Sequence, residues 1–337
     1  MRVYLLGAGA SYGYDPTLPS ILRPPLTDEF FVKGVEWGIL VEDRYPTLVS
    51  RLKSEFLWQG SGGSGDLDRI RKDIEPFLAK ICNEFEKGEP GAQALLGEVT
   101  YYILDLLKRY IIGGVNRFDC YRRLALSYLD APFYVVTLNY DVLLESAANA
   151  VRLSYCYGEP VLPKAIPIAK LHGSISWLNP IGRAIAIGGL RAGDIASVSR
   201  YIYSNRFEVG KPLFLSVQAV ANITDFDVVH SGSNYYEPII VPPQGEFKDY
   251  RKFKIIEGIW RWAEDIFAFA DEIVIIGSSL RKEDSRLWSL ISRLKAGTKL
   301  TIVNPHVEDL AKRVLEVNSK LQLSDTFYDF KTFTKTL

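Results

Sequence analysis

Four short polar motifs, each placed after an apolar run, are the parts of this chain best suited to chemistry. They are residues 7–11 (Gly-Ala-Gly-Ala-Ser), 137–141 (Thr-Leu-Asn-Tyr-Asp), 170–174 (Lys-Leu-His-Gly-Ser) and 277–279 (Gly-Ser-Ser). A glycine turn after a strand presents backbone N–H groups to an anion, because glycine lets a phosphate approach the main chain closely. Together the four motifs predict one nucleotide site that contains reactive side chains.

The first motif predicts a phosphate cradle that follows a strand at residues 2–6. Its members are Gly7, Ala8, Gly9, Ala10 and Ser11, the last contributing a hydroxyl. The simpler alternative is that the glycines only make a tight turn between a strand and a helix. If the cradle binds phosphate, replacing Gly9 by valine is expected to abolish nucleotide binding and to leave the fold mostly intact.

The glycine turn departs from that of a nucleotide-dependent dehydrogenase. The dehydrogenase turn reads G-x-G-x-x-G and is followed about 20 residues later by an acidic residue on the second strand. Here the third glycine, Gly13, falls one position late, and residues 30–37 have a helical pattern where that strand should be. Both departures count against hydride transfer.

Composition describes an ordinary globular chain without a strong charge. Of its 337 residues, 47% are hydrophobic and 24% are charged, with 40 basic and 40 acidic side chains. A neutral chain has no overall field to draw it to nucleic acid or to anionic lipid, so neither is an expected partner. No apolar run approaches the length of a membrane span. Three scattered cysteines fit a reducing compartment, and we expect a cytoplasmic protein.

The order of elements predicts an α/β fold. Apolar spacings of three and four residues from about 26 to 129 indicate amphipathic helices, and a glycine-rich loop at 60–65, which is expected to be flexible, lies between two of them. Beyond Pro132 the pattern changes to strands, which are expected at 133–137, 166–171, 238–241, 272–276 and 299–303. Helices are expected near 142–149, 253–270 and 285–294. Alternation of strand and helix predicts a Rossmann-like parallel sheet with helices on both faces.

The same pattern predicts a single domain of 337 residues with two insertions. Its core is formed by residues 1–25 and 130–337, the helical insertion after the first strand covers about 26–129, and an irregular insertion covers about 175–237.

The motifs and their order resemble the sirtuin (SIR2) family. The resemblance rests on residues 7–11, 137–141, 171–174, 277–280 and Val303-Asn304, and it spans almost the whole chain. The Asn-Tyr-Asp sequence at 139–141 and Pro-Pro-Leu-Thr at 24–27 look like the prokaryotic SIR2-like branch, whose members hydrolyse NAD in anti-phage defence. The resemblance implies a sirtuin-like fold and NAD as substrate.

The resemblance also assigns roles to individual residues. Asn139 would orient ribose hydroxyls or water, Asp141 would bind the nicotinamide carboxamide, and His172 would take a proton from a ribose hydroxyl or from water. The implied cofactor-binding residues beyond the glycine turn are Thr137, Gly277, Ser278 and Asn304. As isolated residues, Asn139 and Asp141 would be turn or helix-cap residues, and His172 a buried structural imidazole.

Departures from the deacetylating sirtuins narrow the implied activity. Those enzymes carry a four-cysteine zinc module after the catalytic histidine, whereas this chain has no cysteine beyond Cys156, so no metal is expected. Leu138 also replaces the glutamine that they place before the asparagine. The prediction is therefore an NAD⁺ glycohydrolase that forms nicotinamide and ADP-ribose. The alternatives are a non-catalytic NAD or ADP-ribose sensor or regulatory subunit, an ADP-ribosyltransferase, and a deacetylase.

The resemblance further implies partners. Constitutive hydrolysis would deplete the NAD of the host, so control is expected. A homo-oligomer and a partner or phage-derived activator are the implied means of that control, with the helical insertion as the expected regulatory surface.

Overall fold

The strand β1 (Arg2–Leu6) is the central strand of a seven-stranded parallel sheet. It pairs with β2 (Phe133–Thr137) on one side and with β9 (Glu272–Ile276) on the other. Residues 3–5 of β1 are fully buried, as expected for an apolar strand that is covered on both faces.

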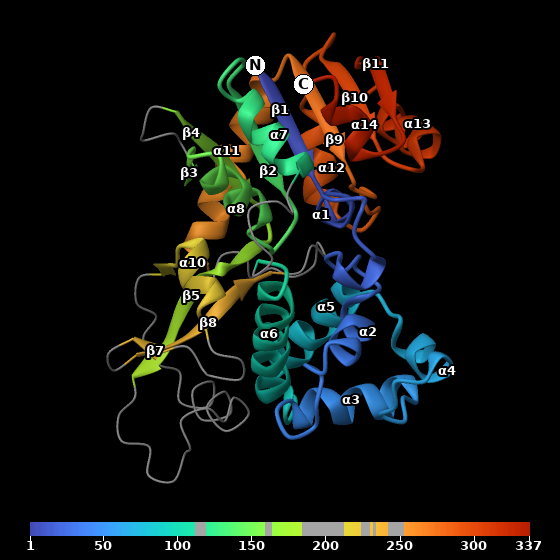
Figure 1. Cartoon of the computed structure of the whole chain (residues 1–337), viewed down its shortest axis with the longest axis vertical. Helices are drawn as coiled ribbons and strands as arrows, with labels where there is room; N and C mark the ends of the chain where they lie inside the picture. Colours follow the sequence, from blue (N-terminus) through green and yellow to red (C-terminus); the bar gives the residue numbers. More distant parts are fainter. Residues whose placement is uncertain (112–118, 159–163, 184–211, 224–229, 232–233, 242–252) are drawn as a thin grey trace. The chain divides into compact units, whose positions relative to one another are not determined.

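A computed structural model shows this arrangement, and the chain divides into two compact units (Figure 1). The residues that the structure describes are 1–111, 119–158, 164–183, 212–223, 230–231, 234–241 and 253–337. The first unit, called the sheet unit here, consists of Met1–Pro24, Gly113–Gly173 and Pro243–Leu337. The second, called the helical unit, consists of Pro25–Ile112 and Ser174–Pro242.

The large sheet of the sheet unit has the strand order β11-β10-β9-β1-β2-β4-β3. The strands not yet given are β3 (Ser154–Tyr157), β4 (Ala165–Lys170), β10 (Lys299–Val303) and β11 (Gln322–Phe327). Each pair of neighbours is parallel. Because all seven strands run the same way, their carboxyl ends meet at one edge.

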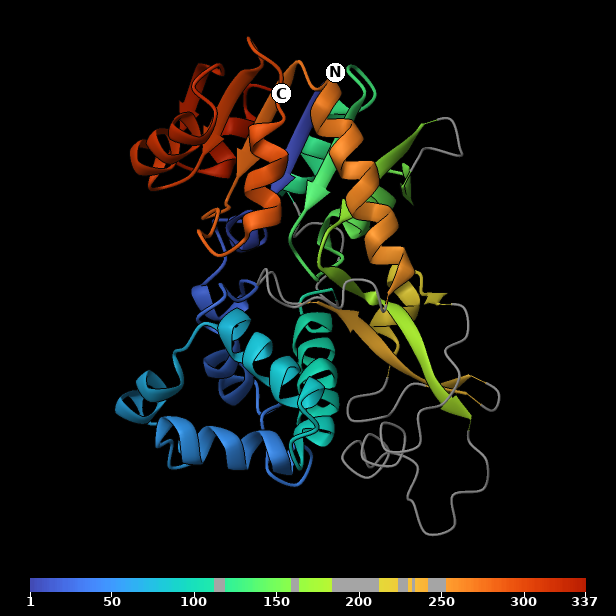
Figure 2. The same cartoon turned by 180° about the vertical axis from the view of Figure 1, so that it is seen from behind.

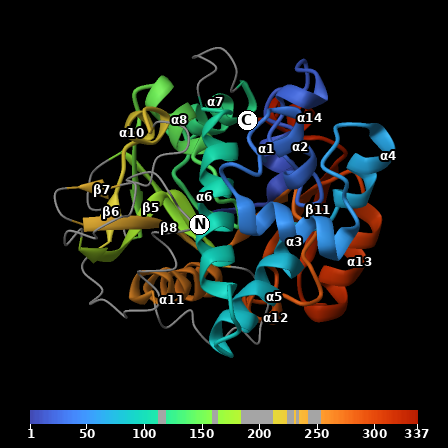
Figure 3. The ribbon, with the colours of Figure 1, turned by 90° about the horizontal axis from the view of Figure 1, so that it is seen from below.

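Helices cover both faces of this sheet. The helical elements of the sheet unit are α1 (Ala8–Tyr12), the 3₁₀ turn η1 (Ser20–Leu22), α7 (Asp119–Ser127), α8 (Leu143–Ala150), α11 (Lys254–Phe269), α12 (Ser285–Ser292), α13 (Val307–Val317) and α14 (Phe330–Thr334). Helix α7 packs on α8 and α14, whereas α11 packs on β4 and α12. Figure 2 shows α11 and α12 across one face, and in Figure 3 α7, α8 and α14 lie on the opposite side of the sheet from α11, α12 and α13.

The helical unit contains helices built around a long buried helix, α6 (Ala92–Lys108). The others are α2 (Phe30–Glu36), α3 (Pro46–Phe56), α4 (Ser64–Leu67), the 3₁₀ turn η2 (Asp68–Ile70) and α5 (Ile74–Glu86). Helices α2, α3 and α5 all pack on α6, which explains why nearly every residue of α6 is buried.

A second, smaller sheet with antiparallel pairs belongs to the helical unit. Its strand order is β6-β5-β8-β7, and its elements are β5 (Gly173–Arg183), β6 (Leu213–Phe214), α10 (Val217–Ala221), β7 (His230–Ser231) and β8 (Asn234–Ile240). Strand β5 begins only three residues after the end of β4. The small sheet therefore follows directly from the large one along the chain.

The predicted α/β class, with a parallel sheet and helices on both faces, is confirmed. Three parts of the predicted organisation differ. Helix α7 lies in the sheet unit rather than in the helical insertion. The strand predicted at 238–241 is the end of β8 and pairs in the small sheet. The glycine-rich loop at 60–65 is partly ordered, because the Asp66 carboxylate accepts hydrogen bonds from the backbone N–H groups of Gln59 and Ser61.

Among the described helices, none combines the length and apolar character that crossing a membrane requires.

Candidate functional site

The motif residues gather at the carboxyl edge of the large sheet. After β1 the chain forms β2 on one side, and it later returns to form β9, β10 and β11 on the other side. The order reverses between β1 and β9, and in open α/β sheets ligands bind at such a switch point. Gly7 follows β1 at this point, and Gly277 follows β9.

The two glycine turns pack backbone against backbone. The Gly7 N–H donates to the Ile276 carbonyl (2.9 Å), and the Gly9 N–H donates to the Gly277 carbonyl (2.8 Å). A Cβ on Gly9 would lie 2.8 Å from that same carbonyl oxygen, and Gly277 has a φ of +60°. Both positions therefore require glycine for the protein's own packing.

This packing limits the predicted cradle. The Ala10 N–H donates to the Gly7 carbonyl (2.9 Å), so the N–H groups of Gly7, Gly9 and Ala10 are all used inside the protein. Ala8 lies between them at the first position of α1. The expectation that valine at Gly9 leaves the fold mostly intact is wrong, because a side chain there meets backbone atoms that have little freedom to move.

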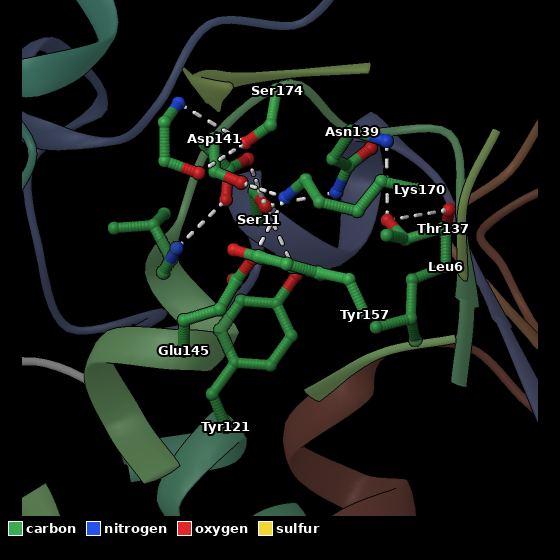
Figure 4. Close-up of polar contacts among 12 residues, drawn as sticks. Leu6, Ser11, Tyr121, Thr137, Asn139, Asp141, Glu145, Tyr157, Lys170 and Ser174 are labelled. Carbon is green, nitrogen blue, oxygen red and sulfur yellow. Dashed lines mark hydrogen bonds and ion pairs between the residues drawn. The ribbon is translucent and has the colours of Figure 1, made fainter. Parts of the chain in front are cut away.

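Ser11, Asn139 and Asp141 form one buried hydrogen-bond network (Figure 4). The Ser11 hydroxyl donates to Asp141 Oδ2 (2.7 Å), and Asn139 Nδ2 donates to Ser11 Oγ (3.0 Å) and to the Gly7 carbonyl (3.0 Å). Both N–H donors of the Asn139 amide are therefore engaged, and a ligand would meet this side chain through its Oδ1. The network connects the loop after β2 with the glycine turn and helix that follow β1.

Tyr121 of α7 completes this network and was not predicted. Its hydroxyl lies 2.9 Å from Ser11 Oγ, and it is the donor in this pair because the Ser11 proton points to Asp141. Burial, reinforced by the nearby Asp141 charge, raises the pKa of Tyr121 well above its ordinary value. The sequence offers little signal for this role, because a tyrosine in an amphipathic helix is typical of core packing.

Asp141 and Thr137 also brace the local backbone. Asp141 Oδ1 accepts from the Leu143 N–H (3.0 Å) at the start of α8, so both carboxylate oxygens have partners. Thr137 Oγ1 accepts from the Asn139 N–H (3.1 Å) and lies 3.4 Å from the Leu6 carbonyl. Asp141 and Thr137 therefore make the turn and helix-cap contacts that these residue types commonly make without any ligand.

A buried ion pair under the same loop was also missed. Lys170 Nζ lies 3.0 Å from Glu145 Oε1, and each side chain is at most 2% exposed. Lys170 Nζ also donates to the Asp141 carbonyl, and the Tyr157 hydroxyl donates to Glu145 Oε1 (3.1 Å). The available signal was a lysine at the end of a wholly apolar strand, since a lysine is rarely buried without a partner.

His172 lies apart from this network, after β4. It is 1% exposed, and neither ring nitrogen has a hydrogen-bond partner among the residues that the structure describes. Its Nε2 lies 3.6 Å from Asp284 Oδ2, and its ring centre lies 6.2 Å from that of Trp260. Within the described residues, no hydrogen bond joins His172 to Asn139 or Asp141.

Ser278 and Asn304 stabilise the turns after β9 and β10. Asn304 Nδ2 donates to the Ser278 carbonyl (3.0 Å), and Asn304 Oδ1 accepts from the His306 N–H (2.9 Å). Ser278 Oγ accepts from the Leu280 N–H (3.2 Å). Ser278 lies beside Gly7, because a Cβ on Gly7 would lie 2.6 Å from the Ser278 Cα, and Asn304 is connected to this position through its hydrogen bond to Ser278.

Over the part of the chain that the structure describes, no group of three or more His, Cys, Asp or Glu side chains is arranged to hold a metal ion.

Comparison with known proteins finds similarity in solved structures alone. No protein-family model and no curated protein matches the chain. It is similar to a Sir2 homologue solved with NAD (14% identity, 94% of this chain and 89% of that one, TM-score 0.40). It is also similar to a sirtuin solved in a study of substrate affinity (14% identity, 100% of this chain and 92% of that one, TM-score 0.41). A third similar structure is a Sir2 mutant with a p53 peptide and NAD (12% identity, 100% of this chain and 91% of that one, TM-score 0.38). Likeness at this level is too low to transfer a function.

Proposed function

We propose that this protein hydrolyses NAD⁺ to nicotinamide and ADP-ribose. The observation that carries the proposal is the buried imidazole of His172, which lies at the carboxyl edge of a parallel sheet. Neither of its nitrogens has a hydrogen-bond partner in the described part of the chain. A buried polar group without a partner is costly, and such groups concentrate where a ligand supplies the missing contact. The order of the motifs along the chain, which resembles that of the sirtuin family, supports NAD as this ligand.

The reaction needs one proton acceptor and no external oxidant. The oxygen of a water molecule bonds to C1′ of the nicotinamide ribose, and the bond from C1′ to the pyridinium nitrogen breaks. The bonding electron pair stays with that nitrogen, so nicotinamide leaves as a neutral molecule. His172 accepts the proton that the water loses and passes it to solvent.

The other residues of the edge bind and orient the substrate in this proposal. Asn139 presents its Oδ1 to ribose hydroxyls, because its N–H groups are already engaged. The fit to the pyrophosphate is partial: Gly9 and Ala10 have no free N–H, which leaves Ala8 as the donor of the turn. Ser278 and Asn304 flank the adenosine ribose.

A second candidate function is a non-catalytic NAD or ADP-ribose sensor. The observation that favours it is the saturation of Asp141, both of whose carboxylate oxygens accept hydrogen bonds from the protein. The two candidates differ in one outcome, since a sensor binds the nucleotide and leaves it intact.

The deciding experiment is to incubate the purified protein with NAD⁺ and to separate the products by chromatography. Equal release of nicotinamide and ADP-ribose supports the proposal. Binding by calorimetry without any product, across a range of protein concentrations, supports the sensor. Release that strictly requires an acetyl-lysine peptide and yields O-acetyl-ADP-ribose would instead identify a deacetylase.

The biological setting is part of the same proposal. Depletion of NAD⁺ in anti-phage defence requires that the enzyme stay inactive until it is triggered. We propose control by homo-oligomerisation and by an activating partner, in the cytoplasm. Sedimentation with and without NAD⁺ tests the oligomer, and a specific activity independent of protein concentration would count against it.

A further inference from the structure

We propose that Asp284 is a positioning residue that fixes the tautomer of His172, with the proton on Nε2 and the free lone pair on Nδ1. The inference rests on the proposed function, because it names Nδ1 as the atom that accepts the proton from water. Asp284 lies 112 positions after His172 in the chain, and no motif pointed to it.

The geometry favours one tautomer. Asp284 Oδ2 lies 3.6 Å from His172 Nε2, and their side chains are 4% and 1% exposed. An ionised carboxylate can only accept, so an N–H on Nε2 stabilises the contact and a lone pair there destabilises it. The favoured neutral imidazole therefore carries its proton on Nε2, which leaves Nδ1 as the base.

The carboxylate of Asp284 is itself held in place. Asp284 is the N-cap of α12, and its Oδ1 accepts from the Leu287 N–H at 3.0 Å. One oxygen therefore serves the helix, while the other is turned toward the imidazole. His172 lies two residues after β4, and Asp284 lies immediately before α12, so regular elements of the sheet unit anchor both residues.

A neighbouring cation is compensated by other groups. The Arg286 guanidinium lies 4.5 Å from the Trp260 ring centre. It pairs with Glu257 at 3.0 Å and with Glu264 at 3.6 Å. Asp284 is therefore not needed to balance Arg286, and its second oxygen remains directed to His172.

The first test measures the tautomer directly, without substrate. Nitrogen-15 NMR of the histidine side chains distinguishes the two neutral forms, and the chain has only three histidines. A His172→Gln variant identifies the signals of His172. We expect the Nε2–H form in the parent protein. Observation of the Nδ1–H form in the parent would overturn the inference without any variant being needed.

The second test replaces Asp284 by asparagine. The Asp284→Asn variant would keep an oxygen for the Leu287 N–H, since asparagine caps helices as well as aspartate does. The new amide nitrogen would then face His172 Nε2 as a donor, so the Nε2–H form should be lost. An unchanged tautomer in Asp284→Asn would contradict the inference. If this variant does not fold, Asp284→Ser keeps a cap and also removes the carboxylate.

The third test measures turnover. A wrong tautomer lowers kcat by about 10²- to 10⁴-fold while KM for NAD⁺ changes little. The matched control is Asp329→Asn, because Asp329 caps α14 through the Thr332 N–H (2.7 Å) and is exposed. This control should retain the parental kcat. If the parent releases no nicotinamide, the proposed function fails, and the tautomer measurement still decides the role of Asp284.

Discussion

Gly9 and Gly277 are required for the packing of the protein's own backbone, independently of any ligand. The Gly9 N–H donates to the Gly277 carbonyl, and each glycine lies where a Cβ of the other would collide with backbone. A G-x-G turn therefore predicts that another group approaches the main chain closely. The sequence does not distinguish a bound phosphate from a second turn of the protein itself.

Replacing Gly9 by alanine should destabilise the fold. The added methyl group would lie 2.8 Å from the Gly277 carbonyl oxygen, and overpacking of this kind costs about 1–3 kcal/mol of unfolding free energy. Urea unfolding of the variant measures the loss. The matched control is Gly258→Ala in α11, where nothing lies within 4 Å of the new Cβ and where alanine should stabilise the helix by about 0.5–1 kcal/mol. Equal stability of Gly9→Ala and the parent would show that the two turns can move apart.

Replacing Lys170 by methionine should destabilise the protein more strongly. The change leaves Glu145 buried without its cation, and breaking such a pair costs about 3–5 kcal/mol of unfolding free energy. The double variant Lys170→Met, Glu145→Gln removes both charges and should recover most of the loss. Denaturant unfolding of the three proteins tests this, and a double variant no more stable than Lys170→Met would show that the ion pair is not the cause.

At the scale of elements, the strands of the large sheet could be predicted closely. The predicted strands 133–137, 272–276 and 299–303 match β2, β9 and β10, because each is a short apolar run. Strand β5 was missed, since it contains Asn179, Pro180 and Gly182, residue types that are depleted from strands. It is formed through pairing with β6 and β8, which no local pattern reveals.

The small sheet should make stability depend on pH. Burial raises the pKa of Glu237 in β8 to about 8, although a hydrogen bond with Asn179 opposes the shift. Because the folded protein holds this proton more tightly than the unfolded chain does, the contribution of Glu237 is fully present below about pH 4.5 and is lost as the pH rises through about 8. Glu237→Gln should therefore be more stable relative to the parent at pH 8.5 than at pH 5. Thermal unfolding at the two pH values measures this, and a difference that does not change with pH would contradict it.

At the scale of the whole molecule, parallel strands explain which part of the candidate site was predictable. Residues that follow different strands, such as Gly7, Asn139, His172 and Asn304, reach one edge because all seven strands run in one direction. Their individual hydrogen-bond partners were not predictable. Tyr121 and Asp284, for example, come from helices whose register against the sheet depends on packing far along the sequence.

Under the proposed function, the release of nicotinamide from NAD⁺ should not require a metal ion. The leaving group of NAD⁺ already carries a positive charge, and the cysteines at 82, 120 and 156 are too far apart in sequence for a CxxC ligand pair. We expect equal rates before and after dialysis against EDTA, and no stoichiometric zinc by mass spectrometry. A loss of rate that added zinc restores would contradict this prediction, and circular dichroism before and after dialysis serves as the control for unfolding.

The position of β1 between β2 and β9 has a consequence for synthesis on the ribosome. Arg2 and Glu272, which pair across β1 and β9, are 270 positions apart, so the first strand emerges long before its second neighbour exists. Until residues 272–284 have been made, the nascent chain lacks both the Gly277 turn and the carboxylate that faces His172. Contacts of such long range fold slowly. A nascent chain that has not reached residue 284 is therefore inert under the proposed function, and a cell that translates this protein is not exposed to its activity before that residue has been made.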